Sequence, residues 1–125
     1  ERIPRRMKVE VRSQNDIAII DCTGDVDLYS SPPLRETLLE KIGSGSSSVL
    51  LNMTGVSYID SSGIATLVEA LQLSRQTKTR FGLYGLRSNA RSVLELARLH
   101  KVFNLFEDEP EALERISSIK PFGGV

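Results

Sequence analysis

The chain has 125 residues, of which 40% are hydrophobic, and this predicts a single domain with its own apolar core. Sixteen basic and sixteen acidic side chains balance, so no net charge would attract nucleic acid or an anionic membrane. The single cysteine excludes an internal disulfide and suits a reducing compartment. No apolar run approaches the ~20 residues that cross a bilayer, and no signal peptide is visible. We therefore expect a soluble, cytoplasmic domain.

The first residues do not fit the pattern of the rest. Residues 1–6, ERIPRR, are expected to be an N-terminal extension or an expression remnant. Residues 7–119 are predicted to form the single domain. Residues 120–125 are a C-terminal tail for which the sequence predicts no structure.

Two strand patterns open the domain. Apolar and charged residues alternate over residues 7–12, which is the period of a half-buried strand. The polar cluster at 13–16 predicts a turn, and residues 17–23 resume as a strand, so the two segments should pair as an antiparallel hairpin. Cys22 shares the apolar side of the second strand, and we interpret it as a small buried residue.

An acidic segment leads from this strand into a helix. Ser31 followed by two prolines predicts a helix start, and Gly43 lies where that helix should end. Asp25 and Asp27 fall in the predicted connection between strand and helix. A metal site or an acid–base pair would need a histidine or a third carboxylate nearby, and the segment has neither. Both aspartates are therefore interpreted as loop and capping residues.

The glycine- and serine-rich segment at 43–48 resembles a phosphate-binding loop only superficially. It precedes a predicted strand, whereas phosphate-binding loops follow a strand and open a helix. It also lacks the lysine of such loops, so we interpret it as a linker.

The most informative stretch is VLLNMTGVSYIDSSGIATLVEAL at 49–71. Its first five residues predict a strand buried on both faces, and Gly55 predicts the turn after it. Asp60 is expected to cap a helix with apolar residues at helical spacing. The residues expected on the outer side of this helix are Thr66, Glu69 and Gln72. Ser61 and Ser62 would then lie at its N-terminal tip, where the helix dipole favours an anionic group.

The remaining third continues the alternation of strand and helix. A short strand is predicted at 81–84, and Ser88 is expected to cap a further helix. The residues that this helix should bury are Ala90, Val93, Leu94 and Ala97. Residues 102–106 are either an edge strand or an apolar tether. Asp108 with Glu111 predicts the cap of a last helix.

Strands that alternate with helices predict parallel pairing with crossover helices, behind an antiparallel first strand. The fold class is therefore α/β, a small sandwich with a mixed sheet of four to five strands and about four helices. Functional groups in such folds collect at the carboxyl ends of the parallel strands. The connections at 24–32 and 55–63 are both of this kind, and we expect them to lie side by side.

Three stretches carry a resemblance to a known family. They are GDVDLYSSPPLRETL at 24–38, the stretch at 49–71, and GLRSNARSVLELARLHKVFNLFED at 85–108. In this order and spacing the chain resembles the STAS family, in particular bacterial anti-sigma factor antagonists. The similarity covers about residues 7–119, and its middle block, with IDSSG between an apolar strand and an apolar helix, is the most specific.

The resemblance implies a function and a set of site residues. Ser61, directly after the aspartate, would be phosphorylated by a cognate anti-sigma factor that is itself a serine kinase. The unphosphorylated protein would bind that anti-sigma factor and free the sigma factor, and a serine phosphatase would restore binding after phosphorylation. Ser62 is the alternative acceptor. The other residues expected at the partner interface are Asp25, Asp27, Asp60, Ser62 and Gly63. No catalytic residue, metal or cofactor is expected.

Two other functions are compatible with parts of this pattern. STAS modules also serve as scaffold subunits of stress-sensing assemblies and as accessory domains of transporters, and such a module would dock through the same loop. A serine hydrolase would need a base, but the only histidine is His100, and the GxSxG motif is absent because IDSSG lacks the first glycine. Nucleic-acid binding is disfavoured because no basic stripe with interleaved aromatic residues is present.

Overall fold

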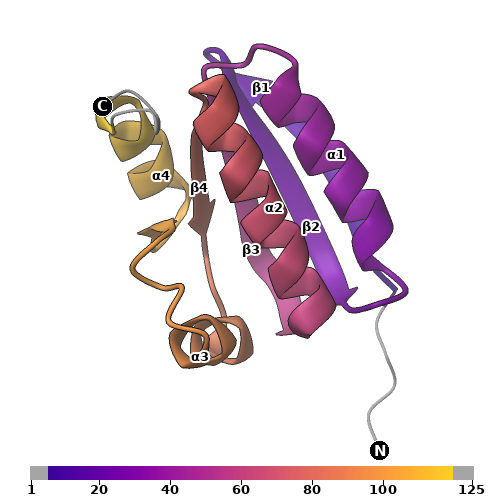
Figure 1. The fold of residues 1–125 in the computed structure, drawn as a ribbon. Coiled ribbons are helices and arrows are strands. Elements are labelled where there is room, and N and C mark those ends of the chain that lie inside the picture. Colours follow the sequence, from indigo (N-terminus) through magenta and orange to yellow (C-terminus); the bar gives the residue numbers. More distant parts are fainter. Residues whose placement is uncertain (1–5, 120–125) are drawn as a thin grey trace, which may run out of the picture.

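A computed structural model describes residues 6–119, in which one sheet has the strand order β1-β2-β3-β4-β5 (Figure 1). β1 is antiparallel to β2, and the other neighbours are parallel. The strands are β1 (Lys8–Gln14), β2 (Ile17–Val26), β3 (Ser48–Ile59), β4 (Arg80–Tyr84) and β5 (Asn104–Phe106). The helices are α1 (Ser31–Gly43), α2 (Ser61–Thr77), α3 (Ser88–Leu96) and α4 (Glu109–Arg115), the last followed by a 3-10 turn (Ile116–Ser118). The predicted mixed α/β sandwich is thus confirmed; residues 1–5 of the expected extension and the tail at 120–125 lie outside the described residues.

The N-terminal hairpin is as predicted, but its turn is tighter. The β1–β2 ladder extends to the pair Gln14 and Ile17, which leaves Asn15 and Asp16 as the turn. Both have positive φ angles, 52° and 67°, which two-residue hairpin turns require and which Asn and Asp tolerate. Ser13 therefore belongs to the strand, although the sequence predicted it in the turn.

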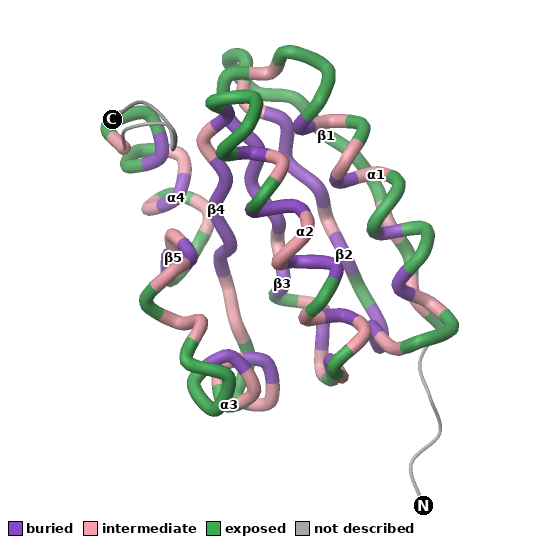
Figure 2. The backbone as a smooth tube through the Cα atoms, viewed as in Figure 1, coloured by how far each residue is buried: buried purple, intermediate pink, exposed green. Residues whose placement is uncertain are grey.

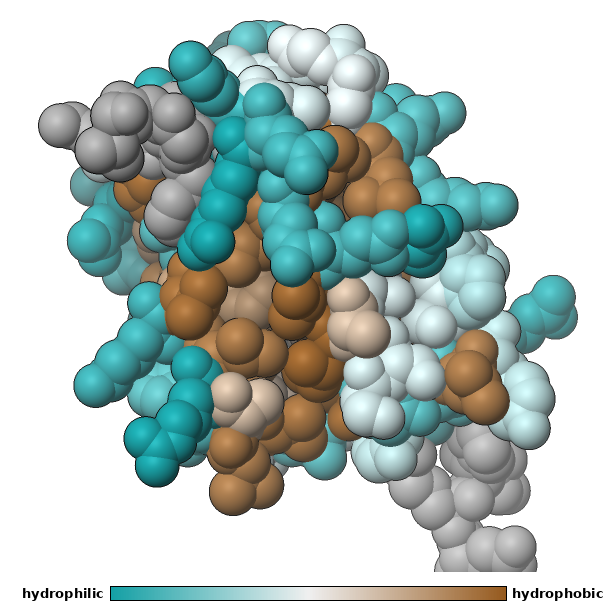
Figure 3. Space-filling model, viewed as in Figure 1, coloured by the Kyte–Doolittle hydropathy of each residue, from teal (hydrophilic) through white to brown (hydrophobic). Residues whose placement is uncertain are grey.

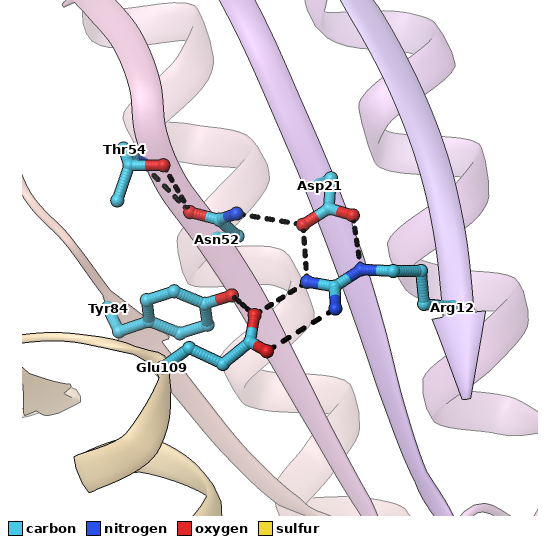
Figure 4. A network of polar contacts seen from close by, with 6 residues as sticks. All are labelled: Arg12, Asp21, Asn52, Thr54, Tyr84 and Glu109. Carbon is cyan, nitrogen blue, oxygen red and sulfur yellow. Dashed lines mark hydrogen bonds and ion pairs between the residues drawn. The ribbon is translucent and has the colours of Figure 1, made fainter. Parts of the chain in front are cut away.

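The sheet separates two apolar clusters. On one face, β2, β3 and β4 contribute Ile20, Leu51 and Leu83 to a core that α1, α2 and α3 cover (Figures 1 and 2). On the other face, Leu50 and its neighbours pack against α4. The rest of that second face carries polar side chains from several strands, which form a hydrogen-bonded network (Figure 4).

Cys22 is part of the first core cluster. Its side chain is buried, and burial raises the pKa of the thiol to about 12. A thiol with so high a pKa is not a nucleophile at neutral pH. The prediction that Cys22 is a small buried residue is confirmed.

The predicted turn at Gly55 is wrong, because β3 continues through it to Ile59. The β2–β3 register shifts between Asp21 and Thr23, and Gly55 then pairs with Thr23. A Cβ on Gly55 would overlap the Thr23 side chain, so this glycine permits a close approach of two strands. An isolated glycine in a strand pattern has this alternative meaning, which the sequence alone did not distinguish from a turn.

Two helices differ from the prediction in detail. Thr66 was expected on the outer side of α2 but is buried, because α2 packs against α1 as well as against the sheet. α3 begins one residue earlier than expected: Arg87 is its N-cap and Ser88 is its first residue. Ala97 lies beyond the end of α3 and is exposed, so its predicted burial is wrong.

Residues 102–106 had two predicted alternatives, an edge strand or an apolar tether, and the structure shows an edge strand. Residues 104–106 form the edge strand β5, whereas 102 and 103 belong to the preceding turn. α3 crosses below β4 instead of covering it, and hydrophobic side chains gather on this face of the molecule between α2 and α3 (Figure 3). Phe81 and Leu83 of β4 belong to the same core cluster as Leu94 of α3 and Phe103.

Candidate functional site

The connections that follow β2 and β3 lie side by side, as predicted (Figure 1). Val26 and Ile59, the last residues of the two strands, are partners in the parallel ladder. The amide of Asp60 then donates a hydrogen bond of 3.1 Å to the carbonyl oxygen of Val26. The β2–α1 loop and the first turn of α2 are consequently held at one edge of the sheet.

Asp60 is the N-cap of α2, as the sequence predicted. Its backbone is extended, and its carboxylate accepts hydrogen bonds from the amides of Ser62 (2.9 Å) and Gly63 (3.2 Å). These amides lack intrahelical partners, and the cap satisfies both of them. The cap fixes the start of the helix, and with it the position of the serine that follows.

Ser61 is the first residue of α2 and is exposed, whereas Ser62 is half-buried. Within residues 6–119 no group hydrogen-bonds the Ser61 hydroxyl. Gly63 is buried beneath them, and a Cβ at this position would overlap the Ile59 side chain. In the DSSG segment, Asp60 is therefore the helix cap, and Ser61 has a solvent-exposed hydroxyl. Ser62 is half-buried, and Gly63 has no room for a side chain.

Asp25 does not lie in the loop where the sequence placed it. It is the penultimate residue of β2 and is only 2% exposed. The Ser57 hydroxyl donates to its carboxylate at 3.3 Å, and the Ser30 hydroxyl donates to its backbone carbonyl at 2.7 Å. Asp25 therefore stabilises the loop through its hydrogen bonds with Ser30 and Ser57, and almost none of its own surface is accessible to a partner.

Asp27 holds the β2–α1 loop in one conformation. Its carboxylate accepts hydrogen bonds from the amides of Tyr29 and Ser30, both at 3.0 Å. The loop thereby presents Leu28 and Tyr29 to solvent, with exposed fractions of 62% and 88%. Sequence reasoning used only the aspartates of this loop; two consecutive large apolar residues between them and the helix start were the signal that it missed.

Asn89, from the first turn of α3, is a second residue that the sequence did not reveal. Its side-chain carbonyl accepts a hydrogen bond of 2.9 Å from the amide of Ile59. This contact ties α3 to the end of β3, next to Asp60. No local pattern predicts it, since the two residues are 30 positions apart.

Metal-ligating side chains, the single histidine and the helix lengths bear on other kinds of site. Within residues 6–119, no three His, Cys, Asp or Glu side chains gather where they could hold a metal ion. His100 lies in the turn after α3, and no hydrogen bond in this part of the chain joins it to Ser61. No helix of the described chain is long and apolar enough to cross a membrane. The features at this edge are an exposed hydroxyl, a helix N-terminus and an exposed loop.

Comparison with known proteins identifies the family. The family model described as the STAS domain matches residues 8–112. The chain belongs to the STAS domain family, and the resemblance seen in the sequence is confirmed.

Individual relatives agree with this assignment. The anti-sigma-F factor antagonist RsfB of Mycobacterium tuberculosis is 26% identical over 110 residues, which cover 88% of this chain and 89% of that protein. A crystal structure of an anti-sigma factor antagonist from Mycobacterium paratuberculosis superposes with a TM-score of 0.82 at 17% identity, covering 89% and 94% of the two chains. The phosphorylated form of the Bacillus cell fate determinant SpoIIAA superposes with a TM-score of 0.68 at 20% identity, covering 88% and 98%. The two structures show that the fold is shared.

Proposed function

We propose that this chain is an anti-sigma factor antagonist, a non-catalytic protein that in its unphosphorylated form binds an anti-sigma factor and so releases a sigma factor. The observation that carries the proposal is the exposed hydroxyl of Ser61 at the capped N-terminus of α2. The name of the mycobacterial relative supports the class of partner. The anti-sigma factor is proposed to be a serine kinase that phosphorylates this hydroxyl, and a serine phosphatase would reverse the step.

Ser61 suits the role of acceptor better than Ser62. Ser61 is exposed and its hydroxyl is open to a kinase, whereas Ser62 is half-buried. A phosphate on Ser61 would lie beside the first amides of α2, where the helix dipole contributes about 0.3–1 kcal/mol in its favour. Phosphorylation should therefore leave the fold intact.

The same phosphate would change the binding surface. It adds about −1.5 to −2 charges at an edge that already carries the carboxylates of Asp27 and Asp60. A partner that covers this edge would have to desolvate the phosphate beside these two carboxylates. Leaving a buried charge unpaired costs on the order of 3–5 kcal/mol, a few hundred-fold or more in affinity. Phosphorylation is thus proposed to end binding through charge, with the fold unchanged.

The test is incubation of the full chain with the candidate anti-sigma factor kinase of its own genome and Mg·ATP. Intact mass and peptide mapping should show one added phosphate on Ser61, accompanied by loss of binding to that kinase. Ser61→Ala should bind and gain no phosphate, and Ser62→Ala is the matched control that should behave like wild type. A phosphate on Ser62 would keep the function and correct the acceptor. Absence of both binding and phosphorylation would overturn the proposal.

A further inference from the structure

Leu28 and Tyr29 are neighbouring large side chains that the β2–α1 loop presents to solvent. Their exposed fractions are 62% and 88%. A single exposed hydrophobic residue is common on protein surfaces, but here two such residues are adjacent in the same loop. We infer that these two side chains are the apolar anchor by which the anti-sigma factor holds this protein, next to Ser61 but separate from it. The inference rests on the proposed function and names the residues that supply affinity at the same edge.

The first argument is that the loop is rigid. Asp27 accepts hydrogen bonds from the amides of Tyr29 and Ser30, and the Ser30 hydroxyl donates to the carbonyl of Asp25 at 2.7 Å. The Asp27 amide donates to the Ser30 hydroxyl oxygen at 2.9 Å, and the Ser31 amide donates to the Asp27 carbonyl at 2.8 Å. A loop fixed by so many hydrogen bonds would lose little conformational entropy when a partner binds. The two exposed side chains are thus presented on a preorganised support.

The second argument is the position of the loop. β2 ends at Val26, which pairs with Ile59 of β3 and accepts a hydrogen bond from the amide of Asp60. Two residues of chain separate Val26 from Tyr29, and one separates Ile59 from Ser61. The two loops are therefore neighbours at one edge of the sheet, and the partner that covers Ser61 is proposed to cover Leu28 and Tyr29 as well. This continuity identifies the occupant as the anti-sigma factor and not an unrelated partner.

The third argument concerns the chemistry of an anchor. Tyrosine and other aromatic residues dominate the binding energy of interfaces because they bury a large area with few rotatable bonds. Truncation of such a residue typically weakens binding roughly 30-fold or more. The anchor is proposed to hold the partner without contacting the transferred phosphoryl group, so its loss should raise KM in the phosphorylation of Ser61 and leave kcat unchanged.

The experiment measures both binding and phosphorylation. The full chain and the variants Leu28→Ala, Tyr29→Ala, Tyr29→Phe and Leu96→Ala are titrated with the anti-sigma factor and then phosphorylated with Mg·ATP. Leu96 is the matched control because it is 85% exposed but lies on α3. Tyr29→Ala should raise Kd and KM by roughly 30-fold or more at constant kcat, and Leu28→Ala should raise both by a smaller factor, whereas Tyr29→Phe and Leu96→Ala should stay within about threefold of wild type.

Other outcomes overturn the inference in distinguishable ways. If wild type binds and is phosphorylated but the alanine variants do so equally well, the anchor lies elsewhere and the proposed function stands. If Leu96→Ala weakens binding as much as Tyr29→Ala, the contact is not confined to this loop. If kcat falls with KM unchanged, the residues orient Ser61 and do not anchor the partner. If wild type neither binds nor gains phosphate, the proposed function fails and the inference fails with it. Thermal unfolding of each variant checks that these exposed truncations leave the fold intact.

Discussion

The side chain of Asn89 accepts a hydrogen bond of 2.9 Å from the backbone amide of Ile59. Ile59 is the last residue of β3, so this contact satisfies a half-buried amide at the point where the sheet ladder ends. The next amide, that of Asp60, is satisfied from the opposite neighbour, by the carbonyl of Val26. The segment that leads into Ser61 is therefore held by α3 on one side and by β2 on the other.

Asn89→Ala is expected to loosen this segment. Leaving the Ile59 amide unsatisfied should cost about 1–3 kcal/mol of unfolding free energy. The amides of residues 59–62 should also exchange with solvent faster than the rest of the sheet, because the segment can then open locally. Hydrogen exchange followed by NMR measures both effects.

Asn104→Ala is the matched control for Asn89→Ala. It removes a similar bond, the one from the Asn104 side-chain amide to the carbonyl of Phe81 (3.0 Å), at the far strand β5. It should lower global stability without faster local exchange at 59–62. Unchanged exchange of the Ile59 amide in Asn89→Ala would show that the contact does not hold the segment.

The cap of α2 gives a prediction that separates hydrogen bonding from charge. Asp60→Ala removes the acceptor of the Ser62 and Gly63 amides and should cost about 1 kcal/mol of unfolding free energy. Asp60→Asn keeps a side-chain oxygen in the same place and should cost much less, because Asn is as good an N-cap as Asp. Urea denaturation of the two variants at neutral pH measures the difference. Equal destabilisation by both would mean that the negative charge, and not the hydrogen bonds, stabilises the start of α2.

Structural features that depend on residues close together in the sequence were predictable from it. The cap at Asp60 and the prolines after Ser31 identify helix starts through short-range chemistry, and α2 and α1 begin at the predicted residues. The alternation of strands and helices was sufficient for the relative directions of the strands and for bringing the two site connections together, but it did not give the strand order. These signals depend on a few consecutive residues and on a general rule for parallel sheets.

What the sequence did not predict depends on distant partners. Gly55 lies in a strand at a point where Thr23 approaches it closely, and Thr66 is buried in a helix that packs against α1 as well as against the sheet. The strand was predicted to end at residue 23, but β2 continues to Val26. Asp25 therefore lies within the strand and is buried. Asn89 contacts Ile59 across 30 positions. Each of these facts is a property of packing between elements, which no local pattern contains.

A polar network on the face of the sheet against which α4 packs joins the first hairpin to α4 (Figure 4). Arg12 of β1 donates to Asp21 of β2 at 2.6 and 2.9 Å, and to Glu109 of α4 at 2.6 and 3.3 Å. Tyr84 donates to Glu109 at 2.5 Å, and Asn52 donates to Asp21 at 2.8 Å. The Arg12 guanidinium is the main cause that lowers the pKa of both carboxyl groups. Arg12 and Glu109 are 97 positions apart in the sequence, so this network connects the N-terminal and C-terminal parts of the domain.

The network predicts a pH dependence of stability that Arg12→Met should reduce. Because the folded-state pKa values of Glu109 and Asp21 are lowered, their stabilisation is complete above the ordinary values of 4.5 and 3.8 and is lost as the pH falls through the lower folded values. Arg12→Met should therefore lower the unfolding free energy at neutral pH, by about 0.4–2 kcal/mol for two partly exposed pairs. The difference from wild type should shrink below about pH 4, which urea denaturation at pH 7, 5 and 3 can follow.

The exposed pair of Arg35 and Glu69, which joins α1 to α2, gives the control for Arg12→Met. Arg35→Met should destabilise less, since solvent screens that pair more fully. A difference between Arg12→Met and wild type that stays constant down to pH 3 would assign the effect to packing of the arginine stem and not to its charge.

Ser61→Asp tests whether charge alone can switch the surface without disturbing the fold. The new carboxylate would occupy the first position of α2, where the dipole favours it, so the unfolding free energy should stay constant or rise by about 0.3–1 kcal/mol. Affinity for the anti-sigma factor should nevertheless fall, though less than on phosphorylation, because a carboxylate adds one charge and a phosphate about −1.5 to −2. Ser61→Asn, of nearly the same shape but neutral, should bind like wild type in the same titration. If Asn weakened binding as much as Asp did, side-chain size at this position, and not charge, would govern the contact.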